Sequence, residues 1–186
     1  MSRETRVERG STVKIGLVEG TLYVAGDAKV LAEDGAKITV NGPVECEGDC
    51  IFECSVETYR FQGSDGPIRV TGDLTVKDRV EVEDGSLEVL GTLNAKTIDV
   101  DQVLEVGRDL VVQDDDVGGT LQVLGSSKAA KIDVGGVFTA RGPVEAEDVD
   151  VGGSFKAEAT VKLATIEVGG TAKVGGGEVT GRIEVG

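Results

Sequence analysis

The chain has 186 residues, a formal net charge of −15, no histidine and no tryptophan. Because proteins bind nucleic-acid phosphates through clustered Lys and Arg, this charge argues against a nucleic-acid partner. The missing histidine removes the commonest general base, so we expect neither an enzyme nor a cofactor. The length fits one domain, and we expect no helices because the apolar residues never follow a spacing of three and four.

Residues 1–11, which begin with the charged segment MSRETRVERG, are predicted to form a flexible N-terminal tail. Arg3, Arg6 and Arg9 lie on this tail, but at ~1 kcal/mol each they would bind an anionic membrane only weakly. Neither a signal peptide nor a long apolar run is visible in the sequence. We therefore expect a soluble, cytoplasmic protein.

Residues 12–67 contain apolar residues in pairs separated by one residue, which is the alternation of a half-buried strand. The spacing between pairs is uneven, and the least regular part, residues 47–66, is predicted to hold a bulged turn or a small loop. We expect this segment to form the irregular first turns of a β-solenoid. The pairs are Val13 with Ile15, Leu22 with Val24, Ala28 with Val30, Ile38 with Val40, and Val44 with Cys46.

The cysteines form one cluster, at Cys46, Cys50 and Cys54. Zinc sites usually leave a gap of two residues between two cysteines, which a tight turn can close, and a gap of three residues in extended chain separates the thiols too far. We expect small buried core residues in the reduced state, with Cys46 and Cys54 pointing inward.

Residues 68–186 are predicted to form the regular part of the solenoid. From residue 89 onward the sequence repeats every seventeen residues, as in VLGTLNAKTIDVDQVLE followed by VGRDLVVQDDDVGGTLQ. Each repeat holds three apolar pairs, and the residues between pairs are rich in Gly, Asp, Lys and Ser, which suit corners. This pattern predicts an all-β, three-sided parallel β-helix of about nine turns, roughly 40 Å long at ~4.8 Å per turn. We expect a right-handed coil, because left-handed hexapeptide solenoids would give a repeat of eighteen.

Asp115 breaks the repeat, since the same position is held elsewhere by Ile98, Ile132 and Ile166. A carboxylate inside a dry core would be costly, so we expect this corner to bulge and turn Asp115 outward. The functional alternative is a hard cation such as Ca²⁺, bound by four carboxylates. That candidate cation site comprises Asp109, Asp114, Asp115 and Asp116.

Six further carboxylates lie between the two inward residues of one side of each turn, so they are predicted to form a single outward row. We call this row the acidic file. Two interpretations stay open: a solvated face, or a docking stripe for a basic partner or a layer of cations. Its members are Asp99, Asp116, Asp133, Asp150, Glu167 and Glu184.

The paired strands, the glycine-rich corners and the lack of long inserted loops resemble the bactofilins, the polymer-forming cytoskeletal proteins of prokaryotes. The resemblance covers residues 68–186 best, as in IDVGGVFTARGPVEAEDVDVGGSFKAEATVKLATIEVGG. It implies a short right-handed β-helix that joins end to end into nucleotide-free filaments, and it brings no catalytic motif. This chain differs in having more turns and in lacking a hydrophobic membrane-targeting start, so membrane association is not expected.

The last turn ends at GRIEVG without a capping helix, which leaves backbone groups available for pairing. We therefore expect the chain to polymerise with itself end to end, with other scaffold or cell-shape proteins as further partners. The alternative is a β-solenoid scaffold that binds partner proteins without polymerising. The predicted polymerisation interface comprises Ile183, Val185, Val174, Val13 and Ile15.

Overall fold

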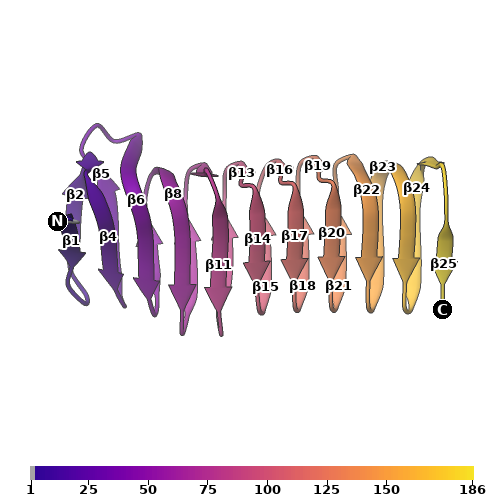
Figure 1. Ribbon diagram of the computed structural model, residues 1–186, viewed down its shortest axis with the longest axis horizontal. Helices are drawn as coiled ribbons and strands as arrows, with labels where there is room; N and C mark the ends of the chain where they lie inside the picture. Colours follow the sequence, from indigo (N-terminus) through magenta and orange to yellow (C-terminus); the bar gives the residue numbers. More distant parts are fainter. Residues whose placement is uncertain (1–2) are drawn as a thin grey trace.

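The computed structural model describes residues 3–186 and shows a straight rod of stacked coils, with the two chain ends at opposite ends of the rod (Figure 1). The described residues form 25 strands and no helix, and each strand pair is parallel. The all-β parallel solenoid predicted from the repeat is therefore confirmed. Among the described residues, no helix has the length and apolar character needed to cross a membrane.

Each coil contributes one strand segment to each of three faces, and strands on one face pair with their counterparts in the next coil. Face 1 contains β1 (Arg3–Val7), β4 (Gly20–Ala25), β11 (Arg79–Glu83), β14 (Thr97–Val100), β17 (Asp114–Val117), β20 (Lys131–Val134) and β25 (Ile183–Val185). Face 2 contains β2 (Thr12–Ile15), β5 (Ala28–Ala32), β7 (Cys50–Phe52), β9 (Pro67–Val70), β12 (Ser86–Val89), β15 (Val103–Val106), β18 (Thr120–Val123) and β21 (Val137–Ala140). Face 3 contains β3 (Leu17–Val18), β10 (Leu74–Val76), β13 (Leu93–Asn94), β16 (Leu110–Val111) and β19 (Ser127–Lys128).

Five longer strands continue around a corner from one face to the next. Strands β6 (Lys37–Glu47), β8 (Ser55–Ser64) and β22 (Val144–Val151) run from face 3 to face 1. Strand β23 (Ser154–Val168) passes through all three faces, and β24 (Thr171–Val179) runs from face 2 to face 3. These strands join the faces without a break at those corners.

The coil length is constant in the C-terminal half and varies in the N-terminal half. From Ile98 to Ile183 each face 1 strand pairs with its neighbour at a step of seventeen residues. Nearer the N-terminus the step varies: it is 17 residues from Thr5 to Leu22 and 22 residues from Leu22 to Val44. The irregular first turns are thus coils of unequal length within one continuous ladder.

The rod has about eleven coils, rather than the nine predicted. One extra coil begins inside the predicted flexible tail of residues 1–11, where β1 pairs with β4 and Val7 is buried. Residues 1 and 2 of that tail lie outside the described residues. Residues 47–66, predicted to hold a bulged turn or a small loop, contain strands β7 and β8, and the pairing of β8 with β6 has one register shift, between Thr58 and Arg60. Their strand pattern was hidden because Thr58 and Gly63 occupy inward positions that are apolar in other coils.

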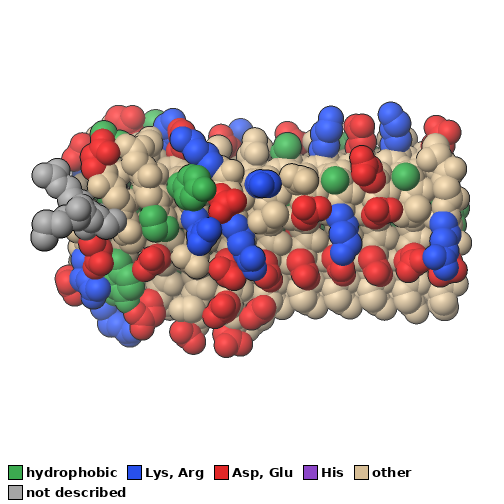
Figure 2. Space-filling view, viewed as in Figure 1, with side chains coloured by type: hydrophobic (Ala, Val, Ile, Leu, Met, Phe, Trp, Pro, Cys, Tyr) green, Lys and Arg blue, Asp and Glu red, His purple; other side chains and the backbone are tan. Residues whose placement is uncertain are grey.

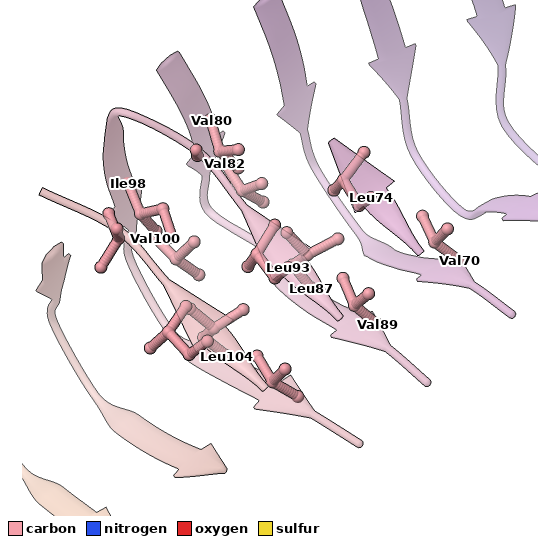
Figure 3. Close-up of a cluster of buried hydrophobic side chains, with 14 of the residues drawn as sticks. Val70, Leu74, Val80, Val82, Leu87, Val89, Leu93, Ile98, Val100 and Leu104 are labelled. Carbon is pink, nitrogen blue, oxygen red and sulfur yellow. The ribbon is translucent and has the colours of Figure 1, made fainter. Parts of the chain in front are cut away.

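The core is a column of apolar side chains that point inward from all three faces. Figure 3 shows one stretch of it, in which Leu74, Val80 and Leu87 come from three different faces and converge on the axis. Two aromatic pairs add to it, with ring centroids 5.8 Å apart for Phe52 and Phe61 and 5.1 Å apart for Phe138 and Phe155. Because each coil packs only against its neighbours, the stack itself provides the core.

From Gly118 onward, glycine pairs form the corner between faces 1 and 2, where a Cβ atom would lie too close to a carbonyl oxygen of the preceding coil. A Cβ atom on Gly135 would lie 2.3 Å from the carbonyl oxygen of Gly118 in the preceding coil. The same contact recurs for Gly152 and Gly169 at 2.4 and 2.3 Å. The Gly-Gly repeats seen in the sequence therefore mark a steric requirement of stacking.

Replacing Gly135 with alanine should lower the free energy of unfolding by roughly 1 to 3 kcal/mol, since the backbone of a packed coil must shift to accept the methyl group. Urea denaturation followed by circular dichroism measures this loss. Gly186→Ala is the matched control, because its Cβ would lie an ordinary 3.4 Å from the oxygen of Gly169. Equal stability of Gly135→Ala and the wild type would contradict this account of the corner.

Candidate functional site

The acidic file is a real row on face 1. Its six predicted members, from Asp99 to Glu184, are consecutive register partners in neighbouring coils. Figure 2 shows acidic side chains in a row along the C-terminal half of the rod. The same column continues toward the N-terminus through Glu81, Gln62, Glu45, Tyr23 and Arg6.

Three basic residues lie beside this column, two positions ahead of Glu81, Asp133 and Glu184 respectively. Arg79 contacts both Glu81 and Asp99, at 3.0 and 2.5 Å. Lys131 Nζ lies 3.2 Å from Asp133, and Arg182 contacts Glu167 at 3.0 Å and also Glu184. These side chains are half-exposed, so each pair contributes only about 0 to 1 kcal/mol.

The remaining repulsion is concentrated around Asp116. Its pKa is raised, first by burial and then by the neighbouring carboxylates Asp133 and Asp99, while Lys131 partly opposes the shift. Face 3 is built differently, because its outward column alternates Lys128, Glu145, Lys162 and Glu178. Of these two outward columns, only the acidic file on face 1 carries charges of one sign.

Asp115 points into the core, so the predicted outward bulge is wrong. Strand β17 keeps its register without interruption, with Asp115 between Ile98 and Ile132, and the residue is 2% exposed. Both carboxyl oxygens lack a hydrogen-bond partner among the described residues. Burial, followed by the charges of Asp116 and Asp133, raises the pKa of Asp115 to about 8. At neutral pH the folded chain therefore holds this carboxyl in its protonated form.

The four carboxylates of the candidate cation site do not converge. Asp114 and Asp116 are exposed on the outside of face 1, whereas Asp115 lies inside. Asp109 lies at the corner before face 3, where it accepts hydrogen bonds of 2.7 Å from both the backbone N–H and the hydroxyl of Ser126, which lower its pKa. Within residues 3–186 no three His, Cys, Asp or Glu side chains are grouped to hold a metal ion.

The three cysteines are buried and free, as the sequence predicted. The Cys50 thiol donates to the carbonyl oxygen of Val24 at 3.5 Å. Burial raises the pKa of the Cys46 thiol well above its ordinary range and that of Cys54 to about 11. All three cysteines are thus buried in the core of the first coils.

The predicted polymerisation residues lie at the two ends of the rod. Ile183, Val185 and Val174 belong to the last coil and are 61%, 51% and 46% exposed, although their columns point inward in every preceding coil. Val13 and Ile15 belong to the first coil, where they are half-buried against the core. The sequence reasoning missed Thr5, which heads the inward column that ends at Ile183, because β1 was taken for a tail.

Each end also presents unpaired strand edges. At the N-terminal end, β1, β2 and β3 each pair with one other strand, β4, β5 and β6 respectively. At the C-terminal end, β24 and β25 pair only with β23 in the described part of the chain. Unpaired edges of this kind can accept a further strand.

Comparison with known proteins gives no match, whether to a family model, to a curated protein or to a solved structure. The argument for function therefore depends on the geometry of this chain: the two ends of the rod and the acidic file between them.

Proposed function

We propose that this chain is a structural protein whose copies join end to end into filaments without a nucleotide, as the resemblance to the bactofilins implies. The observation that carries the proposal is the last coil, where apolar side chains of inward columns are exposed beside two unpaired strand edges. A further coil would bury those side chains and pair those edges. A second copy of the chain supplies such a coil.

This proposal assigns the chain no catalytic role and no cofactor. We place the assembly in the cytoplasm, a reducing compartment in which three free cysteines persist without forming disulfides. Other scaffold or cell-shape proteins would bind along its length.

A second candidate function is a solenoid scaffold that binds partner proteins and does not polymerise. The acidic file favours this candidate, because a row of carboxylates with one sign would attract a basic partner surface. In that case the purified chain would remain monomeric.

The test is imaging of the purified 186-residue chain by negative-stain electron microscopy, with and without added nucleotide. We expect filaments in both samples. Ile183→Glu should raise the critical concentration for assembly by more than about 100-fold, because the joint would bury an unpaired charge.

Val111→Glu is the matched control, since Val111 is an outward, 37% exposed residue in the middle of face 3. This variant should assemble like the wild type. Filaments that form equally well with Ile183→Glu would refute an end-to-end joint at the last coil.

A further inference from the structure

The outward column of face 3 carries charges of alternating sign over its last four rungs. Its members Lys128, Glu145, Lys162 and Glu178 are consecutive register partners, and all four are exposed. Neighbours of opposite charge on adjacent strands can pair with each other, but none of these four forms an ion pair within residues 3–186. Each of the four charges is therefore available to a partner outside the chain.

The surface beside this column is low and almost uncharged. Of the eight residues that lie two positions before or after a member of the column, only Glu147 is charged. The other seven are short: Ser126, Ala130, Pro143, Thr160, Ala164, Gly176 and Thr180. A hollow of about 310 Å³ lies along the column, lined by Lys128, Glu145, Lys162 and the small residues Ala129, Ala146 and Ala164. A second flat surface can thus approach the four charges closely.

Two arrangements with two-fold symmetry place this face against face 3 of a second copy. If the two rods run parallel, about an axis along the rods, each charge meets its own counterpart, Lys on Lys and Glu on Glu. If the rods run antiparallel, about an axis midway between the rungs of Glu145 and Lys162, the order of the column is reversed. Lys128 then meets Glu178, and Glu145 meets Lys162, on both copies. The antiparallel arrangement gives four Lys–Glu contacts and no contact between like charges.

The corresponding columns of faces 1 and 2 lack this property over their last four rungs. The acidic file would place carboxylates against carboxylates in either arrangement. Face 2 ends with Gln122, Thr139, Lys156 and Lys173, which offer no opposite charges to each other. Charge complementarity between two copies is thus specific to face 3.

We infer that face 3 of the last four coils is a docking surface for a second copy of this chain, which binds antiparallel about a two-fold axis between Glu145 and Lys162. The surface lies on the side of the rod, so this contact is separate from the end-to-end joint of the proposed function. Four rungs at ~4.8 Å and four residues at ~3.3 Å give a contact of about 250 Å² per copy. This is well below the ~800 Å² per partner of stable complexes.

The pairing of two single copies is therefore weak and depends on salt. We expect a dissociation constant of about 0.1 to 1 mM at low salt, and at least tenfold weaker binding at physiological salt, which screens exposed charges. At physiological salt an isolated copy is consequently monomeric with respect to this contact.

Cross-linking with a zero-length carbodiimide at low salt tests the arrangement. The Ile183→Glu chain is used, so that the contact is measured with the last coil blocked. We expect a covalent dimer in which mass spectrometry finds an amide bond between Lys128 and Glu178. Within one chain these residues are three rungs apart, about 14 Å, so such a bond joins two antiparallel copies. The absence of a dimer at 1 mM chain, or a dimer linked only through other residues, would overturn the inference.

Charge exchange in the same chain gives a second readout by sedimentation equilibrium at low salt. Lys128→Glu with Lys162→Glu makes the column entirely acidic, and Glu145→Lys with Glu178→Lys makes it entirely basic. Each variant alone should be monomeric, because like charges then meet in every arrangement. Their equimolar mixture should form a 1:1 dimer at least as tight as that of the parent chain. Dimers of either variant alone, or a mixture that stays monomeric, would contradict the pairing.

Lys156→Glu with Lys173→Glu is the matched control, since it makes the same charge change on face 2. This variant should dimerise within about threefold of the parent chain. Filament formation by the wild type is a separate result. Filaments without the lateral dimer would overturn this inference alone, and the lateral dimer without filaments would overturn the proposed function alone.

Discussion

Replacing Asp115 with isoleucine is expected to increase the free energy of unfolding at pH 7 by on the order of 5 kcal/mol, a large gain for one substitution. The isoleucine would continue the column of Ile98 and Ile132, between which Asp115 now stands. It would also remove two buried oxygens that have no hydrogen-bond partner among the described residues.

The pH dependence identifies the cause of this gain. The pKa of Asp115 is about 8 in the folded chain and about 3.9 in an unfolded one, so the folded state retains a proton that the unfolded state releases. The stability of the wild type relative to Asp115→Asn is therefore highest below pH 4. It should fall by on the order of 5 kcal/mol as the pH rises to 8, and then stay level.

Urea denaturation of the wild type, Asp115→Asn and Asp115→Ile at intervals from pH 4 to 9 measures this difference. Asp150→Asn is the matched control, because Asp150 is exposed on the same face and should change stability by only about 0.5 kcal/mol. A difference between Asp115→Asn and the wild type that stays constant with pH would show that this carboxyl does not titrate inside the core.

Replacing Phe138 with alanine is expected to cost about 3 to 5 kcal/mol of folding free energy, since it empties a fully buried aromatic position. The loss includes the stacking contact with Phe155 in the next coil, where the ring centroids are 5.1 Å apart. Coils contact only their neighbours, so the substitution should weaken the link between the coils before β21 and the coils after it.

Denaturation of Phe138→Ala should consequently broaden or split into two transitions, with a lower apparent m-value. Val137→Ala serves as the control, because Val137 is the adjacent, partly exposed residue on the same strand and should have little effect. A loss below about 1 kcal/mol for Phe138→Ala would contradict the role assigned to this column.

The sequence predicted the architecture because the repeat couples two signals, apolar pairs for the strands and glycines for the corners. It placed the acidic file correctly as well, since a seventeen-residue step brings Asp116, Asp133 and Asp150 into one column. The sequence predicted too few coils near the N-terminus. There the pairs include Thr5, Thr58 and Gly63, and the coil length varies, so no fixed period marks them.

The position of Asp115 could not be predicted from the free-energy cost of burying one carboxylate. The expected bulge would have kept the Asp115 carboxylate in solvent, but it would have broken the register of β17 with β14 and β20. Eight residue pairs continue this ladder across the strand, and a protonated carboxyl is less costly than a charged one. The stack therefore imposes its register on a residue that is unsuited to the core.

The central claim is that the last coil of one copy is covered by a coil of a second copy. Sedimentation velocity of the wild-type chain over a hundredfold range of concentration at physiological salt tests it most directly. The account predicts a distribution that shifts to progressively larger species as concentration rises, and that returns to monomer in the Ile183→Glu variant. A wild-type chain that sediments as a single monomeric species over the whole range would contradict it.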